Sequence, residues 1–142
     1  MKSDFVRRSS SIGRHEMHIS FKIKYCHEVF EYEQVQELCR HIFMETAKEM
    51  KIDISEIGFD KNHAHIDIDI GLRSMPEIAK ILKGRTGRKI LKTFPWIKKK
   101  YFWGSGFWSP VVYFDSVGNN RDYIRKYVRE QGKQLKIKEF LN

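Results

Sequence analysis

The chain has 142 residues, of which 41% are hydrophobic, and it carries a formal net charge of +9 with an isoelectric point near 9.6. This composition favours one folded domain over residues 1–142, with nucleic acid as the first candidate partner; a basic protein without a polyanionic partner is the alternative. We see no apolar run long enough to span a bilayer, no secretory signal and no disulfide framework, and therefore expect a protein of the reducing cytosol.

Residues 1–16 are polar and contain Arg7, Arg8 and a run of serines, which predicts a flexible basic arm. From residue 17 to residue 25, apolar and polar residues alternate, which is typical of a strand with one buried face. We expect the apolar members of this strand to face the core: Met17, Ile19, Phe21, Ile23 and Tyr25.

Residues 33–50 carry apolar side chains at helical spacing, which predicts a helix packed on the sheet. A second strand is expected over residues 52–59, and Asp60-Lys-Asn reads as a turn. The strand after this turn should return antiparallel to the second strand.

Residues 63–70 alternate strictly, so one face of this strand should be buried. The apolar face carries Ala64, Ile66, Ile68 and Ile70, and the polar face carries His63, His65, Asp67 and Asp69. At about 3.3 Å per residue, the two imidazoles lie roughly 7 Å apart along the strand. They could share one metal ion if a third ligand came from elsewhere.

The His-x-His spacing also occurs on many strands without a function, so the spacing alone leaves both interpretations open. We expect Asp67 and Asp69 to face solvent or to support the ligands, not to bind the metal themselves. Cys26 and Cys39 fit no zinc spacing.

Ser74-Met-Pro-Glu77 has the pattern of a capping box and predicts the start of a second helix. Gly84 and Gly87 are expected to bend or break this helix, and Pro95 to end it. Basic residues are dense along it, which predicts contacts with phosphate groups. The candidate DNA-binding residues here are Lys83, Arg85, Arg88 and Lys89.

Residues 96–109 combine aromatic residues with lysines. Two interpretations stay open, a nucleic-acid contact through phosphates and base stacking, or a loop whose aromatic side chains pack on the core. A last strand is expected over residues 111–114 and a third helix over residues 121–132. The resulting β-α-β-β-α-β-α order predicts an α+β, ferredoxin-like and RRM-like fold. Its four-stranded antiparallel sheet has helices on one face, and a C-terminal helix follows.

On the third predicted helix, Tyr123, Tyr127 and Gln131 share one face. A phenol one turn from a metal-binding amide can reach a phosphate held on that metal. Two tyrosines packed on the sheet would produce the same spacing.

Several segments in this order resemble the small HUH-type transposases with a single catalytic tyrosine, the TnpA-like enzymes that move insertion sequences as single-stranded DNA. The resemblance covers about residues 17–131. The matching segments are Lys24-Tyr25 continuing to Val29-Phe30, His63-Ala-His65, Leu82-Lys-Gly-Arg-Thr, Phe107-Trp-Ser-Pro and Tyr127-Val-Arg-Glu-Gln131.

The resemblance implies that His63, His65 and Gln131 bind Mg²⁺ or Mn²⁺ and that Tyr127 is the nucleophile. The implied reaction is transposition by cleavage and rejoining of single-stranded DNA through a 5′-phosphotyrosine intermediate. The implied partners are single-stranded DNA with hairpin ends and a second copy of the chain, with active sites completed in trans. The implied location is the cytoplasm of a prokaryotic cell, in association with the nucleoid.

Two other functions are compatible with parts of the pattern. A non-catalytic, RRM-like module that binds single-stranded nucleic acid would use a similar sheet, although the 63–70 strand carries no exposed aromatic residues. A metal-dependent phosphodiesterase acting on small molecules would leave the basic, aromatic segment 96–109 unexplained.

Overall fold

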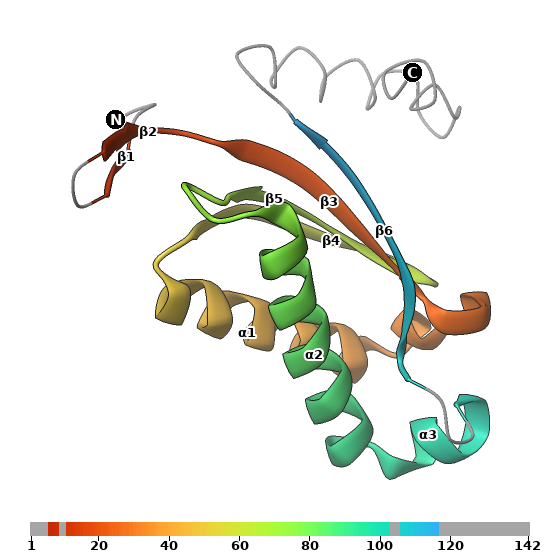
Figure 1. Cartoon of the computed structure of the whole chain (residues 1–142). Helices are drawn as coiled ribbons and strands as arrows, with labels where there is room; N and C mark the ends of the chain where they lie inside the picture. The colour runs from red at the N-terminus through yellow and green to blue at the C-terminus, as the bar shows by residue number, and fades with distance from the viewer. Residues whose placement is uncertain (1–5, 9–10, 103–105, 117–142) are drawn as a thin grey trace.

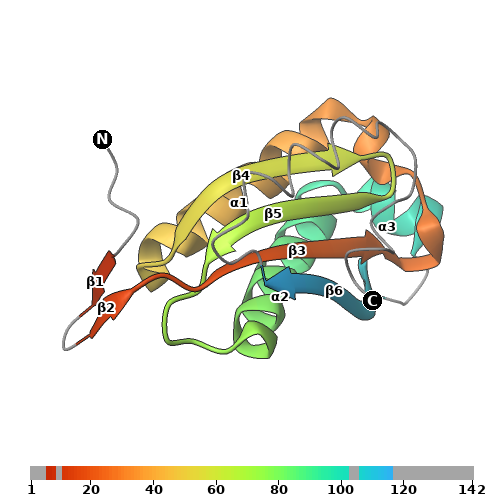
Figure 2. The same ribbon diagram turned by 90° about the horizontal axis from the view of Figure 1, so that it is seen from above.

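The computed structural model describes residues 6–8, 11–102 and 106–116. A four-stranded antiparallel sheet consists of β3 (Glu16–Ile23), β4 (Asp53–Asp60), β5 (His63–Asp69) and β6 (Trp108–Ser116), in the order β4-β5-β3-β6. Helices α1 (Glu33–Met50) and α2 (Met75–Thr93) cover one face of this sheet (Figures 1 and 2). The predicted α+β fold and its ferredoxin-like strand order are therefore confirmed. The predicted third helix lies outside the described residues.

Two short strands, β1 (Val6–Arg8) and β2 (Ser11–Gly13), pair with each other within the segment predicted to be an arm. They form a separate two-stranded sheet, and β3 begins three residues after β2.

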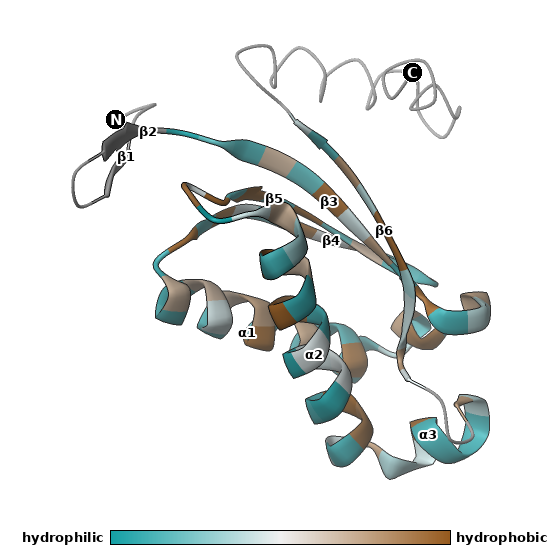
Figure 3. Cartoon of the chain, viewed as in Figure 1, coloured by the Kyte–Doolittle hydropathy of each residue, from teal (hydrophilic) through white to brown (hydrophobic). Residues whose placement is uncertain are grey.

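The alternating strands bury their apolar side chains between the sheet and the helices, as predicted. Ile19 lies opposite Ile66 in the β3–β5 register, and both are buried. Figure 3 shows hydrophilic and hydrophobic residues alternating along β3. The apolar faces of β3 and β5 thus pack against α1 and α2 in the core, and their polar faces lie on the opposite side of the sheet.

Tyr25 is an exception, because it was expected to point inward and is instead 67% exposed. The strand ends at Ile23, and the chain turns into the short 3₁₀ helix η1 (Lys24–Cys26), where Tyr25 has φ 60° and ψ 18°. This left-handed conformation breaks the alternation of a strand and turns the ring outward. A second 3₁₀ helix, η2 (Val29–Glu31), leads into α1.

Helix α2 begins as predicted but is not interrupted at its glycines. The Ser74 hydroxyl accepts a hydrogen bond from the Glu77 N–H at 3.2 Å, which is the expected cap. The helix continues through Gly84 and Gly87 to Thr93. A Cβ at position 87 would lie 3.4 Å from Phe107 Cβ, an ordinary van der Waals distance, so the helix packs closely on the segment before β6 at Gly87. Packing on that segment explains why the expected break does not occur.

The described residues of the aromatic and basic segment 96–109 lie mostly in regular structure, namely a short helix and the start of β6. Pro95 begins α3 (Pro95–Tyr101) directly after α2 ends. Phe102, Phe107 and Trp108 are buried, whereas Trp96 is partly exposed. The aromatic side chains therefore divide between the core and the surface. No helix among the described residues has the length and apolar character needed to cross a membrane.

Phe21 is fully buried on β3, and its ring centroid lies 5.6 Å from that of Trp108 and 6.0 Å from that of Phe43. We expect Phe21→Ala to lower the free energy of unfolding by about 3–5 kcal/mol, because it leaves a cavity between the sheet and α1. Urea denaturation followed by circular dichroism measures this change. Met44→Ala, on the exposed side of α1, is the control and should change stability little; equal losses from both variants would contradict this view of the core.

Candidate functional site

The two predicted ligand histidines lie side by side on the open face of the sheet. His63 and His65 alternate along β5 with the buried Ala64 and Ile66, so they project from the face of the sheet that α1 and α2 do not cover. Their ring centroids are 6.1 Å apart with an angle of 42° between the rings. The strand therefore brings together the two imidazoles that the spacing predicted.

His63 is held by the turn that precedes it. Its Nδ1 lies 3.0 Å from the Asn62 side-chain oxygen, and its Nε2 lies 2.8 Å from Asp60 Oδ2. The Asp60 carboxylate consequently sits at the ring nitrogen through which an imidazole would bind a metal ion. The sequence pattern indicated only a turn at Asp60. The position of Asp60 three residues before His63 was the feature that could have indicated a contact with that histidine.

His65 is positioned by a glycine on the neighbouring strand. Gly58 is the β4 residue opposite His65, and a Cβ at Gly58 would lie only 2.3 Å from His65 Cε1. The imidazole therefore occupies the space above this glycine, where any other residue would place its side chain. Gly58 is a site residue that sequence reasoning missed, because only the strand register shows that the two residues are opposite each other.

A third histidine adjoins His65 from β3. The ring centroids of His18 and His65 are 5.7 Å apart, and His18 Nδ1 lies 2.7 Å from Asp67 Oδ1. The Asp67 carboxylate thus orients His18 beside the predicted ligand pair. The polar face of β3 already placed His18 on this side of the sheet, which was the available signal.

Asp67 and Asp69 do not face solvent, which corrects part of the sequence-based expectation. Their exposed fractions are 6% and 1%. Asp69 Oδ1 accepts hydrogen bonds from the backbone N–H groups of His15 at 2.9 Å and Gly71 at 3.0 Å. The backbone on either side of the strand end covers this carboxylate, so Asp69 joins segments of the chain and supports the fold.

Burial lowers the pKa of His65, and the nearby positive charge of a protonated His18 lowers it further. Both effects favour the neutral imidazole, which is the form that binds a metal ion. The environment of His65 therefore suits a ligand better than an exposed histidine would.

The described residues supply two imidazoles but not a complete metal site. Among residues 6–8, 11–102 and 106–116, no group of three or more His, Cys, Asp or Glu side chains is arranged to hold a metal ion. The predicted third ligand, Gln131, and the predicted nucleophile, Tyr127, lie outside the described residues, as does Tyr123. The chemistry of the histidine pair fits a divalent metal whose remaining ligands come from elsewhere.

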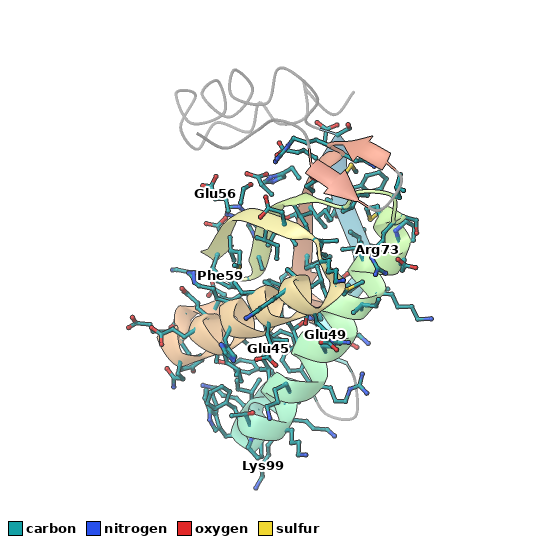
Figure 4. The ribbon with its side chains drawn as sticks, turned by 90° about the vertical axis from the view of Figure 1, so that its left-hand side faces the viewer. Glu45, Glu49, Glu56, Phe59, Arg73 and Lys99 are labelled. Atoms are coloured by element: carbon teal, nitrogen blue, oxygen red, sulfur yellow. The ribbon has the colours of Figure 1, made fainter. Side chains whose placement is uncertain are left out.

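The candidate DNA-binding residues of α2 do not share one environment. Lys83 donates a hydrogen bond to the Ser109 carbonyl at 2.6 Å, and burial lowers the pKa of its ammonium group. Arg85 pairs with Glu49, which lies on α1 beside α2 (Figure 4). Arg88 and Lys89 are also exposed, and within the described residues neither takes part in the contacts that engage Lys83 and Arg85. Because α2 covers the opposite face of the sheet, this basic surface is separate from the histidines.

We expect Gly58→Ala to displace the His65 imidazole while the fold is kept, because a side-chain ring can rotate away from the new methyl group. Imidazole resonances in ¹H–¹⁵N NMR spectra should shift for His65, with only a small change in melting temperature. Gly84→Ala is the matched control, because its Cβ would meet only Arg88 Nη2 at 3.6 Å. An unchanged His65 resonance in Gly58→Ala would contradict the steric argument.

Comparisons with known proteins agree on one family. The family model described as Transposase IS200 like matches residues 11–131. The chain is 27% identical over 118 residues to the ISDra2 transposase TnpA of Deinococcus radiodurans, covering 82% of this chain and 83% of that protein.

Two solved structures have a similar fold. One is a candidate transposase from Deinococcus radiodurans R1, with a TM-score of 0.70, 23% identity, and coverage of 89% of this chain and 97% of that one. The other is a REP-associated tyrosine transposase bound to a REP hairpin, with a TM-score of 0.53, 15% identity, and coverage of 85% and 67%. With a family model that spans residues 11–131, the chain belongs to the IS200-like transposase family.

Proposed function

We propose that this transposase cleaves and rejoins single-stranded DNA through a 5′-phosphotyrosine intermediate on Tyr127, with His63, His65 and Gln131 as ligands of Mg²⁺ or Mn²⁺. The observation that carries the proposal is the pair of imidazoles on the open face of the sheet, with ring centroids 6.1 Å apart. Family membership supports DNA as the substrate.

The proposed chemistry balances without an external energy source. The Tyr127 phenolic oxygen attacks the scissile phosphorus, the bond from phosphorus to the 3′ oxygen breaks, and the proton lost by the phenol is matched by one gained at the departing 3′ oxygen. The phosphotyrosine bond conserves the energy of the phosphodiester, so a 3′-hydroxyl can reverse the step and join a new end. When bound, the metal ion supplies charge stabilisation at the phosphate oxygens.

The described residues have separate roles in this proposal. Burial lowers the pKa of His65 and so favours the neutral imidazole that binds metal ions, and Gly58 leaves the space that this ring occupies. The Asn62 side-chain oxygen forms a hydrogen bond with His63 Nδ1, so Nε2 is the ring nitrogen that would bind the ion. In this structure Nε2 faces Asp60. On the central strands β3 and β5, the open face carries histidines but no Phe, Tyr or Trp, which disfavours the alternative of a non-catalytic RRM-like module.

Hairpin binding is proposed for the basic surface of α2. Arg88 and Lys89 are exposed there, and the similar solved transposase is bound to a REP hairpin. A duplex stem presents closely spaced phosphates, which suit such a surface.

A homodimer with active sites completed in trans is also proposed. Excision requires two cleavages, and each chain offers one Tyr127. In the described part of the chain, β6 pairs only with β3, and its exposed residues include Val111, Tyr113 and Phe114. An open edge with apolar side chains favours pairing with another chain. The cytoplasm of a prokaryotic cell, close to the nucleoid, is the proposed location.

To test the nucleophile and the trans arrangement, labelled single-stranded substrate is incubated with Mn²⁺ and analysed on a denaturing gel. We expect the unmodified protein to form a covalent adduct, and Tyr127→Phe or His63→Ala alone to form none. After subunit exchange, the mixture of these two variants should regain adduct, because one composite site then has an intact tyrosine and intact histidines.

An adduct with Tyr127→Phe alone would move the nucleophile to another residue, such as Tyr123. Failure to complement in proven heterodimers would show that each chain builds its site in cis. Thermal denaturation of both variants checks that each is folded.

Binding to a DNA hairpin should weaken steeply with salt. Each neutralised duplex phosphate contributes about −0.9 to the slope of log K against log salt concentration. We expect Arg88→Gln to reduce this slope by about 0.9, because one phosphate contact is lost. Arg73→Gln is the charge-matched control, since Arg73 lies just before the other end of α2 and pairs with Glu77. Equal slopes for the two variants would place the hairpin elsewhere.

A further inference from the structure

Aromatic and basic side chains gather at the end of the sheet where β3 leads into η1. We call this the end-of-sheet surface, and it consists of Lys24, Tyr25, His27, Lys100 and Tyr101. The His27 ring centroid lies 5.9 Å from that of Tyr25 and 5.0 Å from that of Tyr101. Lys24 Nζ lies 5.7 Å from the Tyr25 ring centroid, and Lys100 Nζ lies 5.2 Å from the Tyr101 ring centroid.

The backbone holds Tyr25 outward in an unfavourable conformation. Tyr25 and Cys26 have φ angles of 60° and 59°, in the left-handed region that residues other than glycine rarely adopt. The segment is nevertheless well anchored at its start, because the Lys24 N–H bonds the Phe107 carbonyl at 3.0 Å. Strained residues that the surrounding structure holds in place concentrate at functional sites.

Contacts on the Tyr101 side fix the position of the second lysine. Lys100 Nζ donates to the Tyr32 hydroxyl at 3.2 Å, and the Tyr32 and Tyr101 hydroxyls are 3.2 Å apart. The Lys100 ammonium group is exposed, so it is held in place but remains accessible to an anion. Two lysines thus flank a row of rings, and only Tyr25 has most of its side chain in solvent.

This surface adjoins the histidine pair. The Ile23 N–H, two residues before Tyr25, bonds the Asn62 carbonyl at 2.8 Å, and the Asn62 side chain contacts His63 Nδ1 at 3.0 Å. Lys22 is the β3 residue opposite His63. Figures 1 and 2 show η1 and α3 at the same end of the sheet as the turn between β4 and β5.

We propose that the end-of-sheet surface binds an unpaired nucleotide of the DNA strand next to the scissile phosphate, with its base stacked on Tyr25 and its flanking phosphates at Lys24 and Lys100. A ring with an exposed face can stack on a base of any sequence, and the Lys24 ammonium group, which lies over the Tyr25 ring 5.7 Å from its centroid, can pair with a phosphate next to that base. Bases in a duplex are already stacked on each other, so the ligand is a single strand. The proposal rests on the proposed function, because it takes the bound strand to be the substrate of the histidine site.

Stacking is tested in a Tyr127→Phe background, so that no strand is cleaved. Single-stranded oligonucleotides carry one 2-aminopurine at successive positions, and its fluorescence falls when the base is stacked. We expect one position to be strongly quenched on binding, and this quenching to disappear with Tyr25→Ala. The dissociation constant should rise about five- to tenfold, the low end for one base stacked on one aromatic ring.

Three further variants separate stacking from other effects. Tyr25→Phe keeps the ring that stacks on the base. Its dissociation constant should stay within about twofold of the parent's, a difference in binding free energy of only about 0.4 kcal/mol. Tyr25→Asn removes the ring with a residue that tolerates the left-handed conformation, so it should match Tyr25→Ala even if alanine strains the turn. Met44→Ala, which removes an exposed apolar side chain from α1, should have no effect.

Lys24→Gln tests the phosphate contact. It should reduce the salt slope for single-stranded DNA by about 0.7, the contribution of one phosphate on a single strand. Binding of a blunt hairpin without a single-stranded extension should be the same for all Tyr25 variants.

Parent-like binding and quenching in folded Tyr25→Ala and Tyr25→Asn would overturn the proposal. An equal loss for the blunt hairpin would also overturn it, because the residue would then serve duplex binding. Failure of the proposed function has a different signature: the unmodified protein would form no covalent adduct, while quenching at one base would persist.

Discussion

Antiparallel hydrogen bonding between β3 and β5 is the constraint on which the other features depend. This register sets Ile19 against Ile66 on the core side and Ser20 against His65 on the open side. Because side chains alternate along both strands, a shift of one residue would move the imidazoles into the core and the isoleucines into solvent. The free energy of burying the isoleucine face therefore holds the histidines in position, and no separate interaction is needed to bring them to the surface.

Steric and electrostatic effects then refine that position. The missing side chain at Gly58 leaves room for the His65 ring above β4, and partial burial there lowers the pKa of His65 and so favours the neutral ring. The contact between Asp67 and His18 adds a third oriented imidazole, from the neighbouring strand β3. One small residue, Gly58, and one buried carboxylate, that of Asp67, thus shape the candidate site on the open face of the sheet.

Most of the fold could be predicted from the sequence, because the period of the apolar residues follows directly from which face is buried. The helix over residues 33–50 has the predicted bounds, and the strands differ from prediction by a few residues at their ends. The helix break at Gly84 and Gly87 was wrong, since propensity is a local tendency and packing against Phe107 outweighs it. The inward position of Tyr25 was wrong, because nothing in its identity signals a positive φ.

The site was predictable to a smaller extent. His63 and His65 are neighbours within one strand, so their proximity followed from spacing alone, whereas Gly58 and His18 enter through strand pairing. Alternation shows which residues share a face, but it does not show which of the polar ones are covered by neighbouring segments. The burial of Asp67 and Asp69 was therefore missed. Charge density along α2 indicated a basic helix but not that Glu49 and the Ser109 carbonyl engage two of its cations.

The sheet and its helix layer separate two surfaces of the protein. Helix α2, with its basic residues, lies on one side of the sheet (Figure 1), and the imidazoles lie on the other face. A helix alone is about 10–12 Å in diameter, so no side chain reaches from one surface to the other. A DNA strand that contacts both surfaces of one chain has to pass round the rim of that chain, and the shortest such route sets a minimum length for the connecting strand. If DNA binds both surfaces of one chain, the thickness of the protein sets the smallest spacing along the DNA between the two contacts, whatever the base sequence.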